Sequence, residues 1–125
     1  MRYVCLIYHE TMRPDAKPGS EREAVAAEAL IYGEELRRQG YVIAAEALQS
    51  AQTAMTVRLR NGRVSTAEGP AAETTEQLNG FILIDARDLN EALQVASKMP
   101  EAKVGSIEVR PIKESHRTDR WMRGG

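Results

Sequence analysis

Residues 3–8, YVCLIY, are apolar on both alternating faces and rich in β-branched and aromatic side chains. Residues 81–85, FILID, repeat this pattern far along the chain. A strand that is apolar on both faces is typical of the middle of a sheet, because a strand with one wet face alternates apolar with polar residues. The two segments are therefore predicted to form the central strands of one sheet.

Capping signals predict a helix after each central strand. An S-x-x-E box at residues 20–23 precedes an apolar stripe that ends near Gly40, which indicates a helix over residues 21–39. A second box, D-L-N-E at residues 88–91, begins another apolar stripe, and Pro100 closes it. Each helix has one apolar stripe and is expected to cover one face of the sheet.

The remaining strands are shorter. Alternation and turn residues predict them over residues 41–47, 53–60 and 106–112. Asn61-Gly62 suits a type I′ turn, so residues 53–60 are expected to turn back as a hairpin. Residues 71–78 are predicted to hold a short helix or a turn.

This order of elements predicts an α+β fold of the ferredoxin-like split βαβ type with an inserted β-hairpin. Both helices cover the same face in that plan, so the other face needs a cover of similar size. The same face of a second copy would supply it, and the sequence predicts a homodimer that pairs sheet to sheet. The domain is expected to span residues 1–112, and residues 113–125 to form a polar, basic tail.

Composition argues against several classes of protein. The chain has 125 residues, 42% of them hydrophobic, and a net charge of -1, so nucleic acid and anionic membranes are not expected as partners. No signal peptide or membrane-spanning apolar run is recognisable in the sequence. Cys5 is the only cysteine and the two histidines lie far apart, so we expect a cytoplasmic protein with no metal site and no cofactor.

Residues 68–80, EGPAAETTEQLNG, resemble the D-G-P-F-A-E-T-K-E-Q-L-G-G segment of the YCII-related family, in the branch named for its DGPF motif. The likeness extends from residue 1 to about residue 114. It implies a ferredoxin-like fold paired into a dimeric α/β barrel and an association with extracytoplasmic-function sigma factors, and it leaves the activity open. Shorter family members have a proposed acid/base dyad whose places fall near Ala29 and Met99, and neither side chain transfers protons.

Three residues are candidates for acid/base catalysis. Glu73 and Glu76 would share one face of a short helix beginning at Pro70, where close carboxylates favour one protonated acid. The alternative is that they stabilise the start of that helix. His9 follows the first central strand, either as a general base or as a solvated loop residue.

Five further residues are candidates for ligand binding: Tyr8, Thr53, Arg58, Gly69 and Pro70. The guanidinium of Arg58 suits a carboxylate or phosphate, and an exposed hairpin arginine is the alternative. Together these residues predict a cofactor-independent small-molecule enzyme or a ligand-binding protein. The alternative function is a non-catalytic regulatory module that contacts a sigma factor through the tail from Lys113 to Arg123.

Overall fold

The computed structural model describes residues 1–10 and 21–113 of the chain. Its elements in chain order are β1 (Arg2–Glu10), α1 (Glu21–Arg38), β2 (Val42–Ala47), η1 (Ala51–Thr53), β3 (Met55–Arg60), β4 (Arg63–Glu68), β5 (Glu76–Asp85), α2 (Leu89–Ser97), η2 (Pro100–Lys103) and β6 (Gly105–Pro111). The elements η1 and η2 are short 3-10 helices. Among the described residues, no helix combines the length and apolar character needed to cross a membrane.

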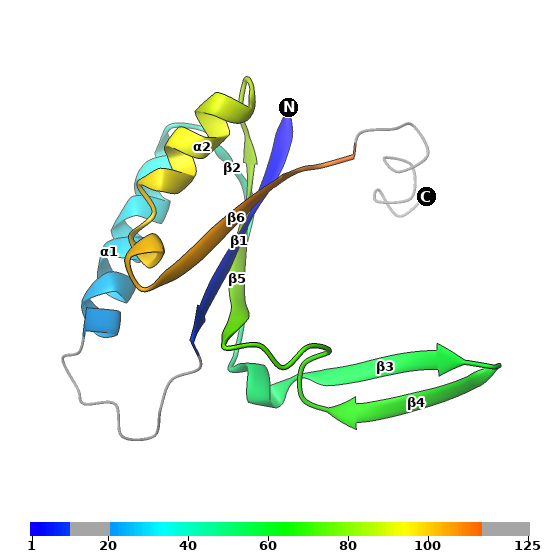
Figure 1. Cartoon of the computed structure of the whole chain (residues 1–125). Helices are drawn as coiled ribbons and strands as arrows, with labels where there is room; N and C mark the ends of the chain where they lie inside the picture. Colours follow the sequence, from blue (N-terminus) through cyan, green and yellow to red (C-terminus); the bar gives the residue numbers. More distant parts are fainter. Residues whose placement is uncertain (11–20, 114–125) are drawn as a thin grey trace.

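The main sheet has four antiparallel strands in the order β2-β5-β1-β6. The central strands are β1 and β5, as their apolar faces predicted, and the order is that of the ferredoxin-like split βαβ plan. Figure 1 shows α1 and α2 together on one side of this sheet, and β3 and β4 as a separate hairpin. The predicted fold class is confirmed, while the pairing of two sheets in a dimer stays a prediction.

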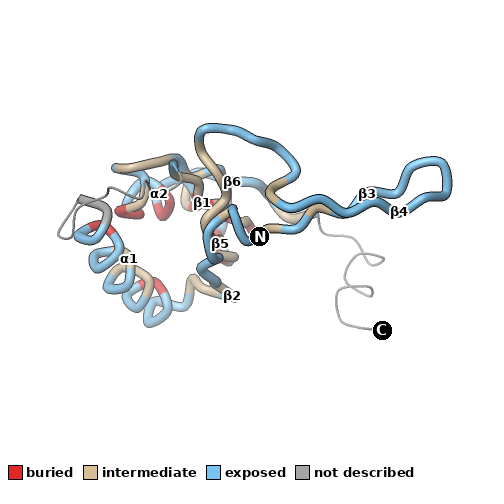
Figure 2. The backbone as a smooth tube through the Cα atoms, turned by 90° about the horizontal axis from the view of Figure 1, so that it is seen from below, coloured by how far each residue is buried: buried red, intermediate tan, exposed pale blue. Residues whose placement is uncertain are grey.

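The core lies between the sheet and the two helices, where Figure 2 shows the buried segments. Cys5 of β1 and Ile84 of β5 are completely buried there, and Tyr3 pairs with Ile84 across the strands. The Tyr32 hydroxyl of α1 donates a 2.8 Å hydrogen bond to the Val95 carbonyl of α2. Burial raises the pKa of this hydroxyl, so it keeps its proton and joins the two helices at neutral pH.

Local sequence signals account for the hairpin turn and for the start of α2. Asn61 and Gly62 have φ angles of 52° and 74°, which confirms the two-residue turn between β3 and β4. The Asp88 carboxylate accepts a 2.9 Å hydrogen bond from the Glu91 amide, which confirms the predicted helix cap. The other predicted box, at residues 20–23, begins outside the described residues.

Two differences from the sequence prediction affect candidate site residues. Residues 71–78 were predicted to hold a short helix or a turn; no helix forms there, and β5 already begins at Glu76, which pairs with Glu10 of β1. Pairing with a distant strand outweighs the local preference of this segment. Thr53 ends η1 instead of beginning a strand, so β3 starts at Met55.

Candidate functional site

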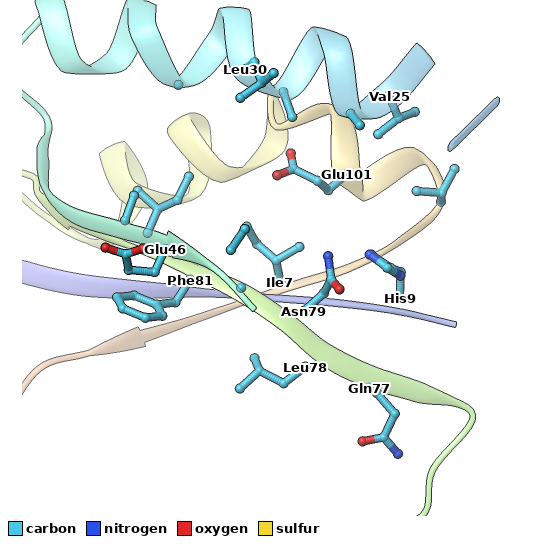
Figure 3. A pocket seen from close by; sticks show the side chains of 18 of the residues that line it. Ile7, His9, Val25, Leu30, Glu46, Gln77, Leu78, Asn79, Phe81 and Glu101 are labelled. Atoms are coloured by element: carbon cyan, nitrogen blue, oxygen red, sulfur yellow. The ribbon is translucent and has the colours of Figure 1, made fainter. Parts of the chain in front are cut away.

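A cavity of about 730 Å³ lies between α1 and the face of the sheet that the helices cover, as Figure 3 shows. On its α1 side lie Val25, Ala29, Leu30 and Gly33, and Ile7 of β1 lies opposite them. Much of this lining is apolar, and the volume is in the range of small-molecule pockets. The cavity is therefore the candidate functional site.

The cavity exists because the middle of α1 carries small residues towards the sheet. A Cβ atom placed on Gly33 would meet nothing within 4 Å, and Ala29 one turn earlier ends at its Cβ. On the sheet side, Ala45 of β2 is equally small. Among the described side chains of α1, only Val25 and Leu36 are fully buried, so the helix makes its core contacts near its ends and leaves space between them.

One end of the cavity carries polar side chains from three elements. Figure 3 shows His9 of β1, Asn79 of β5 and Glu101 of η2 turned towards it. The His9 Nδ1 atom lies 3.0 Å from the backbone carbonyl oxygen of Glu10. Because a carbonyl oxygen only accepts hydrogen bonds, Nδ1 is assigned a proton, and in the corresponding neutral tautomer the lone pair of the ring is on Nε2.

A β-bulge places Asn79 at this end of the cavity. The pairing register of β1 and β5 shifts between Ile7 and Tyr8, which makes Asn79 the extra residue of the bulge. The carbonyl of Asn79 accepts a 2.8 Å hydrogen bond from the Leu48 amide, so this carbonyl keeps a hydrogen-bond partner despite the bulge. Bulges redirect side chains, and this one directs an amide beside His9.

Gly105 determines how closely β6 approaches His9. A Cβ atom on Gly105 would lie 1.9 Å from the carbonyl oxygen of Tyr8 and 2.8 Å from the His9 Cβ. A side chain at this position would push β6 away from the end of β1. The glycine therefore lets two strands hold the histidine in place.

The two candidate carboxylates are not brought together on a helix. Because the helix expected from Pro70 is absent, Glu73 lies exposed in the loop before β5, and Glu76 is the first residue of that strand. The Glu76 carboxylate accepts a 2.8 Å hydrogen bond from the Ser106 hydroxyl of β6. Neither glutamate lines the cavity that contains His9. Two roles were predicted for these glutamates, as an acid/base pair and as residues that stabilise the start of a helix. Both roles required a helix that does not form at these residues.

Three of the ligand-binding candidates make backbone contacts around the base of the hairpin. The Arg58 guanidinium donates to the Ala71 carbonyl at 3.3 Å, and the Gly69 amide donates to the Ala54 carbonyl at 2.7 Å. The Thr53 hydroxyl donates to a backbone carbonyl at 2.7 Å. Gly69 has a φ of 100°, a conformation that favours glycine. These contacts orient the hairpin and give the residues a structural role outside the cavity.

The other two ligand-binding candidates also lie outside the cavity. Tyr8 pairs with Leu78 and Ser106, next to the buried Ile7, so alternation places its side chain on the sheet face away from the helices. Pro70 is half-buried in the loop before β5. His9 is thus the predicted site residue that lines the cavity.

Sequence reasoning missed Asn79 and Glu101. Asn79 stands before Gly80 in a dipeptide typical of turns, and only its pairing with β1 reveals a bulge. Glu101 lies far from His9 in the sequence, and no spacing pattern connects them. Ala29, which falls near one place of the acid/base dyad proposed for shorter family members, lines the cavity without a group that transfers protons. Within residues 1–10 and 21–113, no three His, Cys, Asp or Glu side chains gather as metal ligands.

Comparison with known proteins identifies the family and supports the fold. The profile of the YCII-related domain matches residues 1–116. An uncharacterized protein of Rhizobium meliloti (strain 1021) is 34% identical over 114 residues, covering 90% of this chain and 92% of that protein. A solved structure of 5-chloro-2-hydroxyhydroquinone dehydrochlorinase from Burkholderia phenoliruptrix AC1100, in complex with 2,5-dihydroxybenzoquinone, is similar with a TM-score of 0.50. It is 16% identical, over 94% of this chain and 98% of that one, and the likeness shows a shared fold.

Proposed function

The chain belongs to the YCII-related family, and on this premise we propose that it binds a small organic molecule in the cavity beneath α1 and removes a proton from it through His9. The observation that carries the proposal is the position of His9, whose ring lies at the polar end of a largely apolar cavity with its Nδ1 atom facing a backbone carbonyl. Imidazole is the side chain best suited to exchange protons near pH 7. The reaction would be proton abstraction without a cofactor.

The lining indicates which kind of molecule fits. Leu30 and Ile7 offer contact to an apolar body, whereas Asn79 and Glu101 offer hydrogen bonds to polar substituents beside His9. A small ring with hydroxyl or carbonyl oxygens on one edge combines these features. The compound in the structural neighbour, 2,5-dihydroxybenzoquinone, is of this kind and serves as the first probe.

The test compares glutamine substitutions at two adjacent positions. His9→Gln keeps a polar side chain but removes the ring nitrogen that accepts a proton, whereas Glu10→Gln changes an exposed neighbour outside the cavity. Binding of 2,5-dihydroxybenzoquinone would be measured by calorimetry at pH 7. We expect His9→Gln to weaken binding about two- to tenfold, as the loss of a hydrogen bond worth roughly 0.5–1.5 kcal/mol does, and Glu10→Gln to leave it unchanged.

Equal affinity of the wild type and both variants would show that His9 does not contact the ligand. A wider panel of hydroquinones, benzoquinones and hydroxybenzoates then tests the cavity itself. Absence of binding across the whole panel would contradict the proposed class of ligand.

A cytoplasmic location is part of the proposal, because Cys5 is a free, buried thiol and such thiols suit a reducing compartment. The alternative function, a module that contacts a sigma factor, depends on a tail that lies almost wholly in residues 114–125, outside the described chain. A pull-down of sigma factors with and without this tail tests that alternative separately.

A further inference from the structure

The Glu101 carboxylate enters the cavity without a donor from the protein. Glu101 is half-buried on η2, and Figure 3 shows its side chain in the space between α1 and the sheet. Among the described residues, it makes no side-chain hydrogen bond and no ion pair. Lys103 of the same short helix donates instead to Glu28 of α1 at 3.0 Å. Arg37 also lines the cavity, but it lies about 18 Å along α1 from Val25, at the other end.

Packing holds η2, and Glu101 with it, at the wall of the cavity. Met99 is 2% exposed and Pro100 is buried, so the start of η2 is anchored in the core. The ion pair between Lys103 and Glu28 joins the end of η2 to α1. Because the backbone is held on both sides of Glu101, the carboxylate keeps its place when a ligand enters.

The polar end of the cavity offers more acceptors than donors. A carboxylate accepts hydrogen bonds and donates none, so Glu101 is an acceptor. His9 faces a carbonyl with Nδ1, and in the corresponding neutral tautomer its Nε2 atom is an acceptor as well. The Asn79 amide both donates and accepts. A ligand that displaces water from these groups has to replace the hydrogen bonds that the water made, so it needs donors of its own.

A hydroxyl group meets these requirements, whereas a carbonyl or an ammonium group meets only part of them. A hydroxyl donates to Glu101, and its oxygen still accepts from the Asn79 amide. A carbonyl oxygen has no proton for Glu101, and an ammonium group has no lone pair for Asn79. A second hydroxyl on the neighbouring carbon of a ring would donate to His9.

We propose that Glu101 determines the specificity of the cavity and selects rings with neighbouring hydroxyl groups over rings whose substituents only accept hydrogen bonds. This inference rests on the proposed function, because it concerns the ligand of the same cavity. A site that hydrogen-bonds a ligand hydroxyl rejects an analogue without it, because the polar group of the site is then left unpaired. Ile7 and Leu30 contact either kind of ring, so the discrimination comes from the carboxylate.

Two probes of similar size test this role in the full chain. Catechol carries two neighbouring hydroxyls, and in 1,2-difluorobenzene two fluorine atoms that donate no hydrogen bond replace them. Glu101→Met removes the acceptor and keeps the length of the side chain. Glu35→Met makes the same change at an exposed position of α1 outside the cavity and serves as the control.

The measured quantity is the ratio of the dissociation constants of the two probes, from NMR titrations at pH 7. The ratio cancels any general effect of a substitution on the cavity. We expect Glu101→Met to shift it about tenfold or more against catechol, as the loss of a hydrogen bond to a charged group does, and Glu35→Met to leave it unchanged. Glu101→Gln keeps an oxygen that accepts, so it should shift the ratio less, and it supports the test if Glu101→Met does not fold.

An unchanged ratio in both Glu101 variants, or an equal shift in Glu35→Met, overturns the role of Glu101. A lower melting temperature with an unchanged ratio would show that Glu101 only stabilises η2. Benzylamine is the third probe: if it binds more tightly than catechol and loses this affinity in Glu101→Met, the choice of a hydroxyl is wrong. Binding of both rings without a shift contradicts Glu101 alone, whereas binding of no probe to the wild type contradicts the proposed function as well.

Discussion

Filling the cavity from α1 should separate ligand binding from stability, and Gly33→Leu is the substitution that does so. A Cβ atom at this position meets nothing within 4 Å and borders a cavity of about 730 Å³, so the added side chain enters open space. Glycine in a helix interior costs roughly 0.5–1 kcal/mol relative to alanine, and leucine has nearly the helix propensity of alanine. We expect the free energy of unfolding to rise by that amount and the melting temperature by about 2–5 °C.

Ligand binding should change in the opposite direction. The added side chain takes space that the ligand needs beside Leu30, so calorimetry should show binding of 2,5-dihydroxybenzoquinone weakened about tenfold or more. Gly33→Ala is the control, because it makes the same gain in helix propensity with a single methyl group. Unchanged binding by Gly33→Leu would refute the cavity as the site. A melting temperature below that of the wild type would show that the space at Gly33 is not open.

Four other predictions concern the sheet, a cap, a turn and the thiol. Ile82 packs against the core and Leu83 lies on the opposite sheet face, so circular dichroism and light scattering should show an unfolded chain for Ile82→Glu and a folded monomer for Leu83→Glu. Asp88→Ala removes the cap of α2 and should lower the free energy of unfolding by about 1 kcal/mol, which corresponds to a fall in melting temperature of about 3–5 °C. Gly62→Val should also lower it, because a β-branched residue is strained at a φ of 74°; an unchanged value would mean that the turn relaxes. Burial raises the pKa of the Cys5 thiol from 9.0 to about 11, so its stabilising effect is complete below pH 9 and is lost as the pH rises through 11. Denaturant unfolding across this range should show a smaller loss for Cys5→Ala than for the wild type.

Local chemistry was sufficient to predict the plan of the fold. Residues 3–8 and 81–85 are apolar on both faces, which suits only a covered position in a sheet, and they lie within the central strands β1 and β5. Asn61 adopts a positive φ with its neighbouring glycine because both residues tolerate that conformation. Asp88 caps α2 because its carboxylate and the amide it binds are only three residues apart.

The candidate site depended on contacts between distant segments, which only the tertiary structure decided. Glu76 begins a strand because Glu10 pairs with it, and the bulge that directs Asn79 into the cavity arises from the same pairing. Glu101 lines the same cavity as His9 because η2 and the end of β1 border one space. In the sequence, the small residues of α1 fit two arrangements equally well: close packing of the helix on the sheet, or a cavity between them. Periodicity and capping act within a few residues of the chain, whereas the space between two elements is set by all the side chains that hold them apart.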